Sequence, residues 1–286
     1  MSSHYASGDG RGVLVTGCSS GIGRSIAQRL ARGGWTVFAT VRKDQDREGL
    51  SRLGERNLVP VCPFELTEGD QVSRAVDFVG AELDRRGQSG LYAVVNNAGS
   101  GSVAPIELLD LSLFELELKV RLVGAVGLVQ KALPLLREGG GRIVWIVTPA
   151  IIPTPFVADI HACDFAVNCV VRTLGIELAP WKIPCVQVRC GGIRTGKGLE
   201  TTKEVESLLR HPKANLYREH IEAWSGAMAE FDRRRTPPDK VAMLVEKALR
   251  SRFPRKRYSV GYMHRAAAFL ESLPQSWVDR ILTSRF

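Results

Sequence analysis

The chain has 286 residues, 44% hydrophobic and 24% charged, which is enough for one sizeable core within a single domain. Its net charge is +9, but the positive charge gathers in only two runs, at 233–235 and 252–257, so we expect no nucleic-acid partner. No stretch reaches 18 consecutive apolar residues, which argues against a membrane-spanning helix. Residues 1–11 lack an apolar signal core, and we expect a disordered leader there.

Short runs rich in valine and isoleucine alternate with longer segments of helical period. The predicted strands are 12–16, 36–41, 58–62, 91–95, 142–147 and 185–190. Helices are expected from about 22, over 106–137 after Pro105, and over 159–179. This order predicts an α/β fold, a doubly wound parallel sheet of Rossmann type, in one domain spanning 12–286.

The segment 197–240 changes character, because it is charged, helical in period and poor in β-branched residues. Such folds bind ligands at the carboxyl edge of the sheet, so we expect this segment to form a helical lid over a substrate. The last segment, FLESLPQSWVDRILTSRF, is weakly amphipathic and is expected to pack on the core.

The six cysteines include no C-x-x-C pair and mostly lie in apolar surroundings. This usage favours buried thiols in a reducing compartment, and we expect a cytoplasmic protein that binds no metal.

A glycine-rich loop, TGCSSGIG, directly follows the first strand and precedes the first helix. Glycines at this spacing permit a tight turn and a close approach of a pyrophosphate to the backbone at a helix N-terminus. The candidate cofactor-binding residues of this loop are Gly17, Ser19, Ser20, Gly21, Ile22 and Gly23.

Two basic residues, Arg42 and Lys43, stand at the end of the second strand. An acidic residue there would bind a ribose 2′-hydroxyl, whereas a basic one accommodates a 2′-phosphate. The sequence therefore favours NADP(H) over NAD(H), unless Arg42 is simply a solvated strand-end residue.

Four motifs in order resemble the short-chain dehydrogenase/reductase family. They are the glycine loop TGCSSGIG, the acidic-apolar-hydroxyl element 65–67, the N-N-A-G element 96–99 and the segment 190–195. The strings TGCSSGIG and FATVRK are similar to the hydroxysteroid and retinol dehydrogenase branch of the family. The resemblance implies contacts with adenine, the central cofactor and nicotinamide from Glu65, Leu66, Asn97, Ala98, Gly99, Gly191, Ile193 and Thr195. It also implies a homo-oligomer, a dimer or tetramer paired through the two long helices.

The resembled family relies on an Asn, a Ser and a Tyr-x-x-x-Lys pair, and this chain departs from all four. Arg121 stands at the Asn position and Thr148 at the Ser position. Counting forward from the fifth strand puts His161 at the Tyr position; counting back from Phe165 puts Ile160 there and Asp164 at the Lys position. The five tyrosines, at 5, 92, 217, 258 and 262, are expected to lie far from this site.

The replaced groups can still form a site. Arg121 and Asp164 could pair across it, although both could also point to solvent. His161 lies three residues before Asp164 on the same helix face, where the carboxylate could orient or charge it. Thr148 could donate its hydroxyl to a substrate oxygen, or simply cap the strand. We take Arg121, His161, Asp164 and Thr148 as the candidate catalytic residues.

Three functions remain open. The first is an NADP(H)-dependent enzyme that delivers hydride to an iminium, imine or activated carbonyl of a bulky apolar small molecule; it is loosely similar to reductases converted for natural-product biosynthesis. The second is a redox-neutral cyclase or isomerase in the same pocket. The third is a non-catalytic nucleotide-binding partner. An intact glycine loop beside replaced catalytic groups favours a cofactor-binding enzyme over an inert scaffold.

Overall fold

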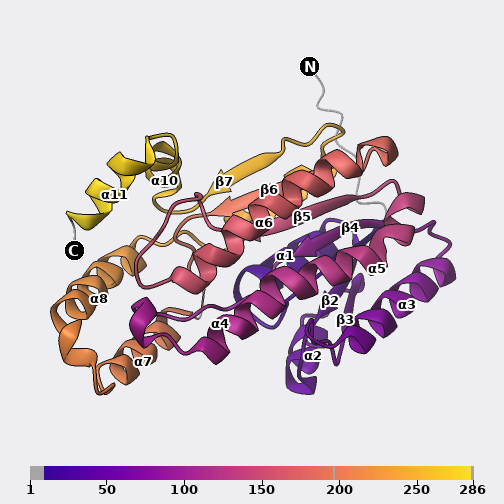
Figure 1. Ribbon diagram of the computed structural model, residues 1–286. Helices are drawn as coiled ribbons and strands as arrows, with labels where there is room; N and C mark the ends of the chain where they lie inside the picture. Colours follow the sequence, from indigo (N-terminus) through magenta and orange to yellow (C-terminus); the bar gives the residue numbers. More distant parts are fainter. Residues whose placement is uncertain (1–9, 196, 285–286) are drawn as a thin grey trace.

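The computed structural model describes residues 10–195 and 197–284, without the side chains of 197–202, so most of the predicted leader lies outside the described residues. Seven parallel strands form one sheet in the order β3-β2-β1-β4-β5-β6-β7 (Figure 1). They are β1 (Gly12–Val15), β2 (Thr36–Thr40), β3 (Leu58–Val61), β4 (Leu91–Asn96), β5 (Arg142–Val147), β6 (Cys185–Cys190) and β7 (Arg257–Val260). The six predicted strands are confirmed, with ends shifted by no more than a residue.

Helices cover both faces of the sheet, which is the predicted doubly wound arrangement. The helices α1 (Gly21–Arg32), α2 (Asp44–Ser51) and α9 (Asp239–Arg250) contribute to one buried cluster, and α3 (Gly69–Arg85), α5 (Ala125–Glu138) and α6 (Ala158–Glu177) to the other. Along β1, Val13 and Val15 point into the first cluster and Leu14 into the second. Both faces of each inner strand are buried, which is why these strands read as continuous apolar runs.

The seventh strand was missed by the sequence analysis. β7 lies at the edge of the sheet beside β6, and of its four residues only Tyr258 is buried. An edge strand with solvent on one side does not need an apolar run, and this one follows the basic run 252–257. Because β7 begins at Arg257, within that basic run, it was not predicted as an apolar strand.

The single helix predicted over 106–137 is wrong in detail. The chain forms η1 (Ile106–Leu108), α4 (Leu111–Glu117), the π-helical segment η2 (Leu118–Gly124) and then α5. Asp110 caps α4 by accepting a hydrogen bond from the Ser112 amide at 2.8 Å. Gly124 ends the π segment against Leu66, where a Cβ would meet the Leu66 carbonyl oxygen at 2.5 Å. The wide turn therefore brings this helix close to the predicted adenine side.

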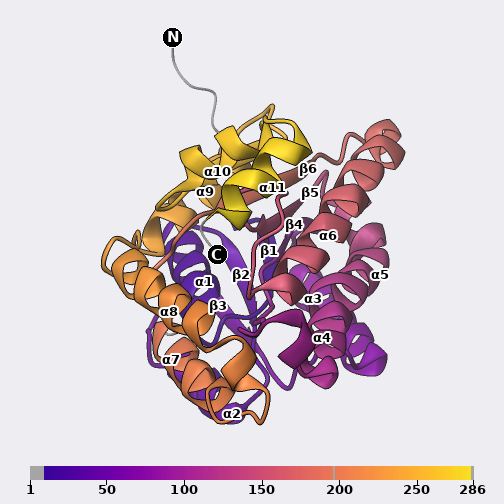
Figure 2. The ribbon, with the colours of Figure 1, turned by 60° about the vertical axis from the view of Figure 1, so that its left-hand side comes forward.

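The predicted lid region contains α7 (Lys197–Leu208), η4 (Ala214–Leu216) and α8 (Arg218–Arg233). Val205, Leu208 and Ile221 pack with Val103 and Phe156 in a third, smaller core. Figure 2 shows α7 and α8 standing opposite α4 across the carboxyl edge of the sheet.

The remaining elements are η3 (Ala179–Trp181), α10 (His264–Glu271) and α11 (Gln275–Thr283). The predicted packing of the C-terminal segment is loose, because α10 buries no residue and α11 buries only Val278. Among the described residues, no helix combines the length and apolar character required to cross a membrane.

Candidate functional site

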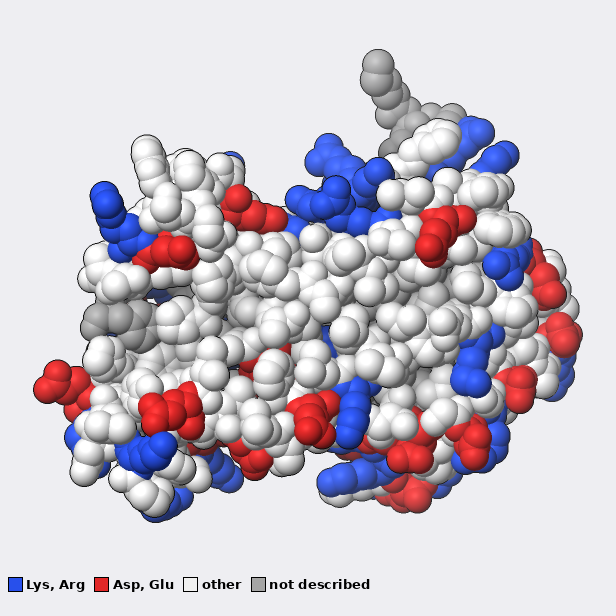
Figure 3. All heavy atoms as spheres, in the orientation of Figure 1, with Lys and Arg blue, Asp and Glu red and all other residues white. Residues whose placement is uncertain are grey.

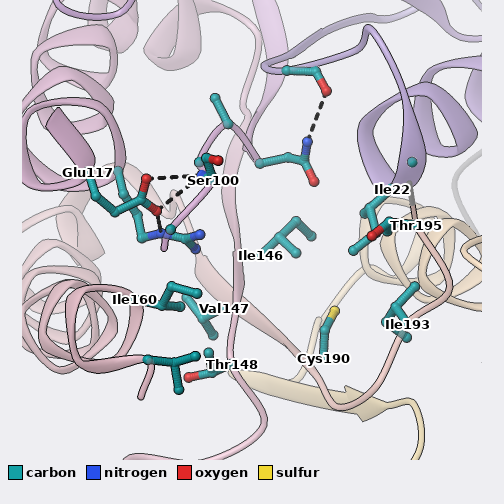
Figure 4. Close-up of a pocket in the computed structure, with 18 of the residues that line it drawn as sticks. Ile22, Ser100, Glu117, Ile146, Val147, Thr148, Ile160, Cys190, Ile193 and Thr195 are labelled. Atoms are coloured by element: carbon teal, nitrogen blue, oxygen red, sulfur yellow. Dashed lines mark hydrogen bonds and ion pairs between the residues drawn. The ribbon is translucent and has the colours of Figure 1, made fainter. Parts of the chain in front are cut away.

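A cavity of about 880 Å³ opens at the carboxyl edge of the sheet, between the glycine loop and the lid helices. Its lining includes all of the predicted cofactor-binding residues except Lys43, and the candidate catalytic residues Arg121, Thr148 and His161. Figure 4 shows two sides of it, with Glu117, Ser100, Ile160 and Thr148 on one and Ile22, Ile193 and Thr195 on the other.

The glycine loop has the tight turn that the sequence predicted. Gly17 has φ +71°, and a Cβ on Gly23 would lie 2.1 Å from the Gly17 carbonyl oxygen, so α1 can approach the loop only with glycine at 23. Ser19 and Ser20 are exposed before the first turn of α1 and line the cavity, and Ser20 makes no side-chain hydrogen bond that would cap the helix. This cradle suits a diphosphate.

The N-N-A-G element is hydrogen-bonded to the start of the glycine loop. The Thr16 hydroxyl accepts hydrogen bonds from the amides of Asn97 (2.9 Å) and Ala98 (3.0 Å). Asn97 Nδ2 donates in return to the carbonyl oxygens of Thr16 (3.0 Å) and Gly17 (3.2 Å). β4 and β1 are thereby joined where a dinucleotide would lie across them.

The two predicted 2′-phosphate residues, Arg42 and Lys43, differ in their relation to the cavity. Arg42 is exposed, lines the cavity and forms an ion pair with Glu65 at 3.7 Å. Lys43 is exposed ahead of α2 and does not line the cavity. An exposed pair of this kind contributes little to stability, so the Arg42 guanidinium is free to exchange partners.

Arg121 lies in a buried ionic ladder on the π segment. Its Nε donates to Glu117 Oε1 at 2.6 Å and its Nη1 to Asp164 Oδ1 at 3.4 Å. The side chain is 15% exposed, that of Glu117 5% and that of Asp164 1%. Burial by itself would lower the pKa of Arg121, but the charges of Asp164 and Glu117 outweigh burial and raise it. The predicted Arg121–Asp164 pair is present, and the alternative of two solvated side chains is wrong.

The ladder also anchors two loops of the site. Both Glu117 carboxylate oxygens accept from the Ser100 amide, at 3.0 and 3.2 Å (Figure 4). Asp164 Oδ2 accepts from the Thr148 amide at 2.7 Å. Arg121 thus bridges the carboxylates that hold the loops after β4 and β5. Asp164 lies beneath the cavity and does not line it, so any effect it has on a substrate acts through its charge and through Arg121 and Thr148.

A second buried carboxylate, Asp159, closes the same side. It accepts hydrogen bonds from the amide and hydroxyl of Ser102 at 2.6 and 2.8 Å and is fully buried. Glu117, Asp159 and Asp164 are therefore three buried carboxylates on this side of the site, and Glu117 and Asp164 pair with Arg121. The sequence analysis missed Glu117, although its spacing of four residues from Arg121 was a readable signal.

Ile160 and His161 occupy different faces of α6. Ile160 stands one turn before Asp164 and packs against Gly101, where a Cβ would meet its Cγ1 at 2.0 Å. His161 turns instead toward 152–154, with Nδ1 2.9 Å from the Ile152 carbonyl oxygen. Which of the two registers applies, with Ile160 or His161 at the Tyr position, stays a prediction.

The protonation state of His161 follows from that contact. A carbonyl oxygen only accepts, so Nδ1 carries the hydrogen and Nε2 is the acceptor of the neutral ring. Burial lowers the pKa of His161, against the pull of Asp164. His161 is therefore a neutral side chain on the cavity wall.

Tyr262 corrects the expectation that all five tyrosines lie far away. It follows β7 and lines the cavity, with its backbone paired to Gly192 through hydrogen bonds of 2.9 and 3.2 Å. The position was hidden because β7 itself was missed. Thr148 lines the cavity as predicted, and its hydroxyl donates weakly to the Ala150 carbonyl oxygen at 3.4 Å.

The chain matches the family model described as short chain dehydrogenase over residues 11–206. The chain belongs to the short-chain dehydrogenase family. It is 32% identical to human 11-beta-hydroxysteroid dehydrogenase type 2 over 75% of the chain, which corresponds to 53% of that longer protein. It is 30% identical to the uncharacterized oxidoreductase YbbO of Escherichia coli K12, over 95% of the chain and 94% of that protein.

A solved structure agrees on the fold. L-sorbose reductase of Gluconobacter frateurii, complexed with NADPH and L-sorbose, superposes with a TM-score of 0.71 at 21% identity, over 88% of this chain and 95% of that one. The predicted family and the predicted similarity to hydroxysteroid dehydrogenases are confirmed by the family model and by the human relative. Among the described residues, no group of three His, Cys, Asp or Glu side chains is arranged to hold a metal ion.

Proposed function

We propose that this short-chain dehydrogenase family member is an NADP(H)-dependent reductase that delivers hydride to an iminium, imine or activated carbonyl carbon of a bulky apolar small molecule. The proposal rests on the buried ion pairs of Arg121 with Glu117 and Asp164, which occupy the region where the family has its Tyr-x-x-x-Lys pair. In the register that aligns the segment from Phe165, Ile160 takes the position of the proton-donating tyrosine, and Asp164, which pairs with Arg121, takes that of the lysine.

The electrostatics of the ladder favour a cationic reaction centre. Glu117, Asp159 and Asp164 outnumber Arg121 beside the cavity, so the field there is negative when all four are ionised. Burial would raise the pKa of Glu117, but the charge and hydrogen bond of Arg121 outweigh it and lower the pKa, so Glu117 stays ionised at neutral pH. Such a field stabilises an iminium ion in its reactive charged form.

The chemistry suits a site with isoleucine at position 160. When bound, the cofactor would supply the hydride. Reduction of an iminium ion forms a C–H bond while the C=N π electrons return to nitrogen, and the product is a neutral amine without any proton transfer. Reduction of a ketone needs a proton at oxygen, which Ile160 cannot provide. The chain's residues would then bind and orient the substrate, exclude water and supply the field.

The choice of NADP(H) rests on Arg42. Residue Arg42 lines the cavity, and within the described part of the chain its ion pair is the partly exposed one with Glu65, so a 2′-phosphate could compete for its guanidinium. The related L-sorbose reductase was solved with NADPH.

A redox-neutral cyclisation or isomerisation is the second candidate, and His161 favours it. A neutral imidazole with Nδ1 tied to the Ile152 carbonyl presents Nε2 as a general base. That reaction would proceed with bound NADP⁺ as readily as with NADPH, and the cofactor would not be consumed.

The proposal extends to a homo-oligomer. Large apolar side chains are exposed along α4, η2 and α6, among them Leu111, Val123, Phe165 and Ile176. Figure 3 shows a broad uncharged surface over this face with charged residues gathered at its margins. A dimer through this face would cover it. A role in natural-product biosynthesis and a cytoplasmic location stay predictions.

The function is tested by titrating the protein with NADPH and NADH through nicotinamide fluorescence, then mixing the NADPH complex with ketones, imines and iminium ions in single turnovers. We expect tight NADPH binding and oxidation by the iminium ions. NADPH binding with no oxidation by any of them, but conversion of a substrate with NADP⁺ bound, would support the redox-neutral candidate instead. Absence of any nucleotide binding would contradict both.

A further inference from the structure

The end of the lid is fastened to the loop after β6. The Thr236 amide donates to the Gly192 carbonyl oxygen at 3.0 Å, and the Arg194 amide donates to the Thr236 carbonyl oxygen at 2.8 Å. This pairing places the neighbouring side chain, that of Arg235, beside Gly192 and inside the cavity. It belongs to the basic run 233–235, to which the proposed function gives no role.

Arg235 differs from the other members of that run. Its side chain is 15% exposed, whereas those of Arg233 and Arg234 are 80% and 59% exposed. Its Nε is buried without a hydrogen-bond partner among the described residues. Its Nη2 forms an ion pair with Asp232 Oδ1 at 2.6 Å, so it is Nε, and not the whole guanidinium, that has a donor to spare.

An aromatic ring also lies beside the guanidinium. Its Cζ lies 5.7 Å from the centroid of the Phe231 ring, which packs so closely on Gly192 that a Cβ there would meet the ring at 2.6 Å. Leaving a buried N–H donor of a charged group, here Nε, without an acceptor costs free energy. The most direct way to satisfy it is an anionic oxygen in the cavity.

A second donor faces the same region. Tyr262 lines the cavity and stacks edge-on against Phe231, with ring centroids 5.2 Å apart. Its hydroxyl oxygen accepts from Arg234 Nη1 at 3.4 Å, which leaves its own hydrogen to be donated to a ligand.

The two sides of the cavity thus carry different ionic groups. Glu117 and its neighbouring carboxylates stand on one side, and Ile193, next to the loop that Arg235 joins, stands on the other (Figure 4). We propose that the substrate carries a carboxylate at the end distant from its cationic reaction centre, and that Arg235 binds this carboxylate. The inference deepens the proposed function and rests on it.

An anionic oxygen could also come from the cofactor diphosphate. The pairing argues against that source, because Arg235 lies beside Gly192, whereas the diphosphate cradle at Gly21 faces Thr195, whose Cγ2 would be 3.1 Å from a Cβ on Gly21. The substrate side of the loop is therefore the nearer one.

The test compares two probes with the same apolar chain and opposite charge, octanoate and octylammonium, by calorimetric titration of the NADP⁺-saturated protein. Arg235→Met should weaken octanoate binding by about tenfold or more, since a charge-assisted hydrogen bond is removed. Arg235→Lys should retain part of the affinity, and Arg233→Met, the exposed control, should change nothing. Octylammonium binding and the NADPH dissociation constant should stay within about twofold of wild type in every variant.

Three outcomes would overturn the inference. They are octanoate binding that is absent from the wild type at millimolar concentration, octanoate binding that is equal in wild type and Arg235→Met, and a tenfold loss of NADPH affinity in Arg235→Met, which would assign Arg235 to the diphosphate. Failure of the proposed function is distinguishable, because it appears as wild-type protein that binds no NADPH or oxidises none.

Discussion

Arg121 Nε lies 2.6 Å from Glu117 Oε1, four residues earlier, and this contact is the shortest in a buried ladder that continues to Asp164. The pair is positioned by the change from α4 to the π segment, which begins one residue after Glu117. π-helical turns inside helices often occur at functional sites because they redirect side chains. Here the redirected side chain reaches across to α6.

Glu117→Gln should destabilise the protein strongly. It keeps the shape of the side chain but removes the charge facing a buried guanidinium, and we expect a loss of about 3 kcal/mol in the free energy of unfolding. Glu115→Gln is the matched control, because Glu115 is exposed on the same helix and pairs with Lys119 at 3.6 Å with the same spacing. Urea denaturation of both variants measures the difference, and equal losses would contradict a structural role for the ladder.

Arg42→Ala should separate the two nicotinamide cofactors. Loss of a charge-assisted contact with the 2′-phosphate should raise the NADPH dissociation constant about tenfold or more and leave that of NADH within about twofold. Arg47→Ala is the control, since Arg47 pairs with Asp44 at 3.0 Å outside the cavity. Fluorescence titration with both cofactors checks this, and equal losses for NADPH and NADH would remove Arg42 from the 2′-phosphate site.

Stability should depend on pH through His161. Burial lowers its pKa below the ordinary 6.5, so the unfolded chain takes up a proton at a higher pH than the folded protein does. The stability linked to His161 is therefore complete above 6.5 and is lost as the pH falls from there toward the folded pKa. In His161→Gln, which cannot titrate at this position, the melting temperature should change less between about pH 7 and 5.5 than in the wild type. Parallel curves for the two proteins would show that His161 does not carry this effect.

Asp164→Asn should slow reduction of cationic substrates without weakening cofactor binding. The amide oxygen can still accept from the Thr148 amide, but the charge that faces Arg121 and the cavity is lost. We expect a fall of about tenfold in the single-turnover rate with an iminium substrate, and an unchanged dissociation constant for NADPH. Asp77→Asn, exposed on α3, is the control. An unchanged rate in Asp164→Asn would remove Asp164 from the proposed mechanism.

The sheet and the cofactor loop could be predicted because they depend on local sequence. Buried parallel strands require continuous apolar runs such as RIVWIV, and the glycine loop requires glycine where backbone meets backbone, as at Gly23. Both requirements can therefore be recognised in the sequence alone.

The rest of the site depends on partners far apart in the chain. β7 lies at the sheet edge and buries one residue, so its sequence does not have the apolar pattern of a buried strand. Because β7 was not predicted, the position of Tyr262 beside Gly192 was not predicted either. The Arg121–Asp164 pair was predictable from positions in the family motif, but the closer partner Glu117 lies outside those positions. Arg235 reads as one of three arginines, and only the lid's pairing with Gly192 shows which of them turns inward.

The central claim is that reduction at this site needs no proton donor. The most direct measurement is the single-turnover rate of NADPH oxidation by an N-alkylated iminium ion in H₂O and in D₂O, beside a ketone of the same carbon skeleton. We expect rapid oxidation by the iminium ion with no solvent isotope effect, because no proton moves, and negligible oxidation by the ketone. Ketone reduction at a comparable rate, with a solvent isotope effect, would contradict it and would require a proton donor in the cavity.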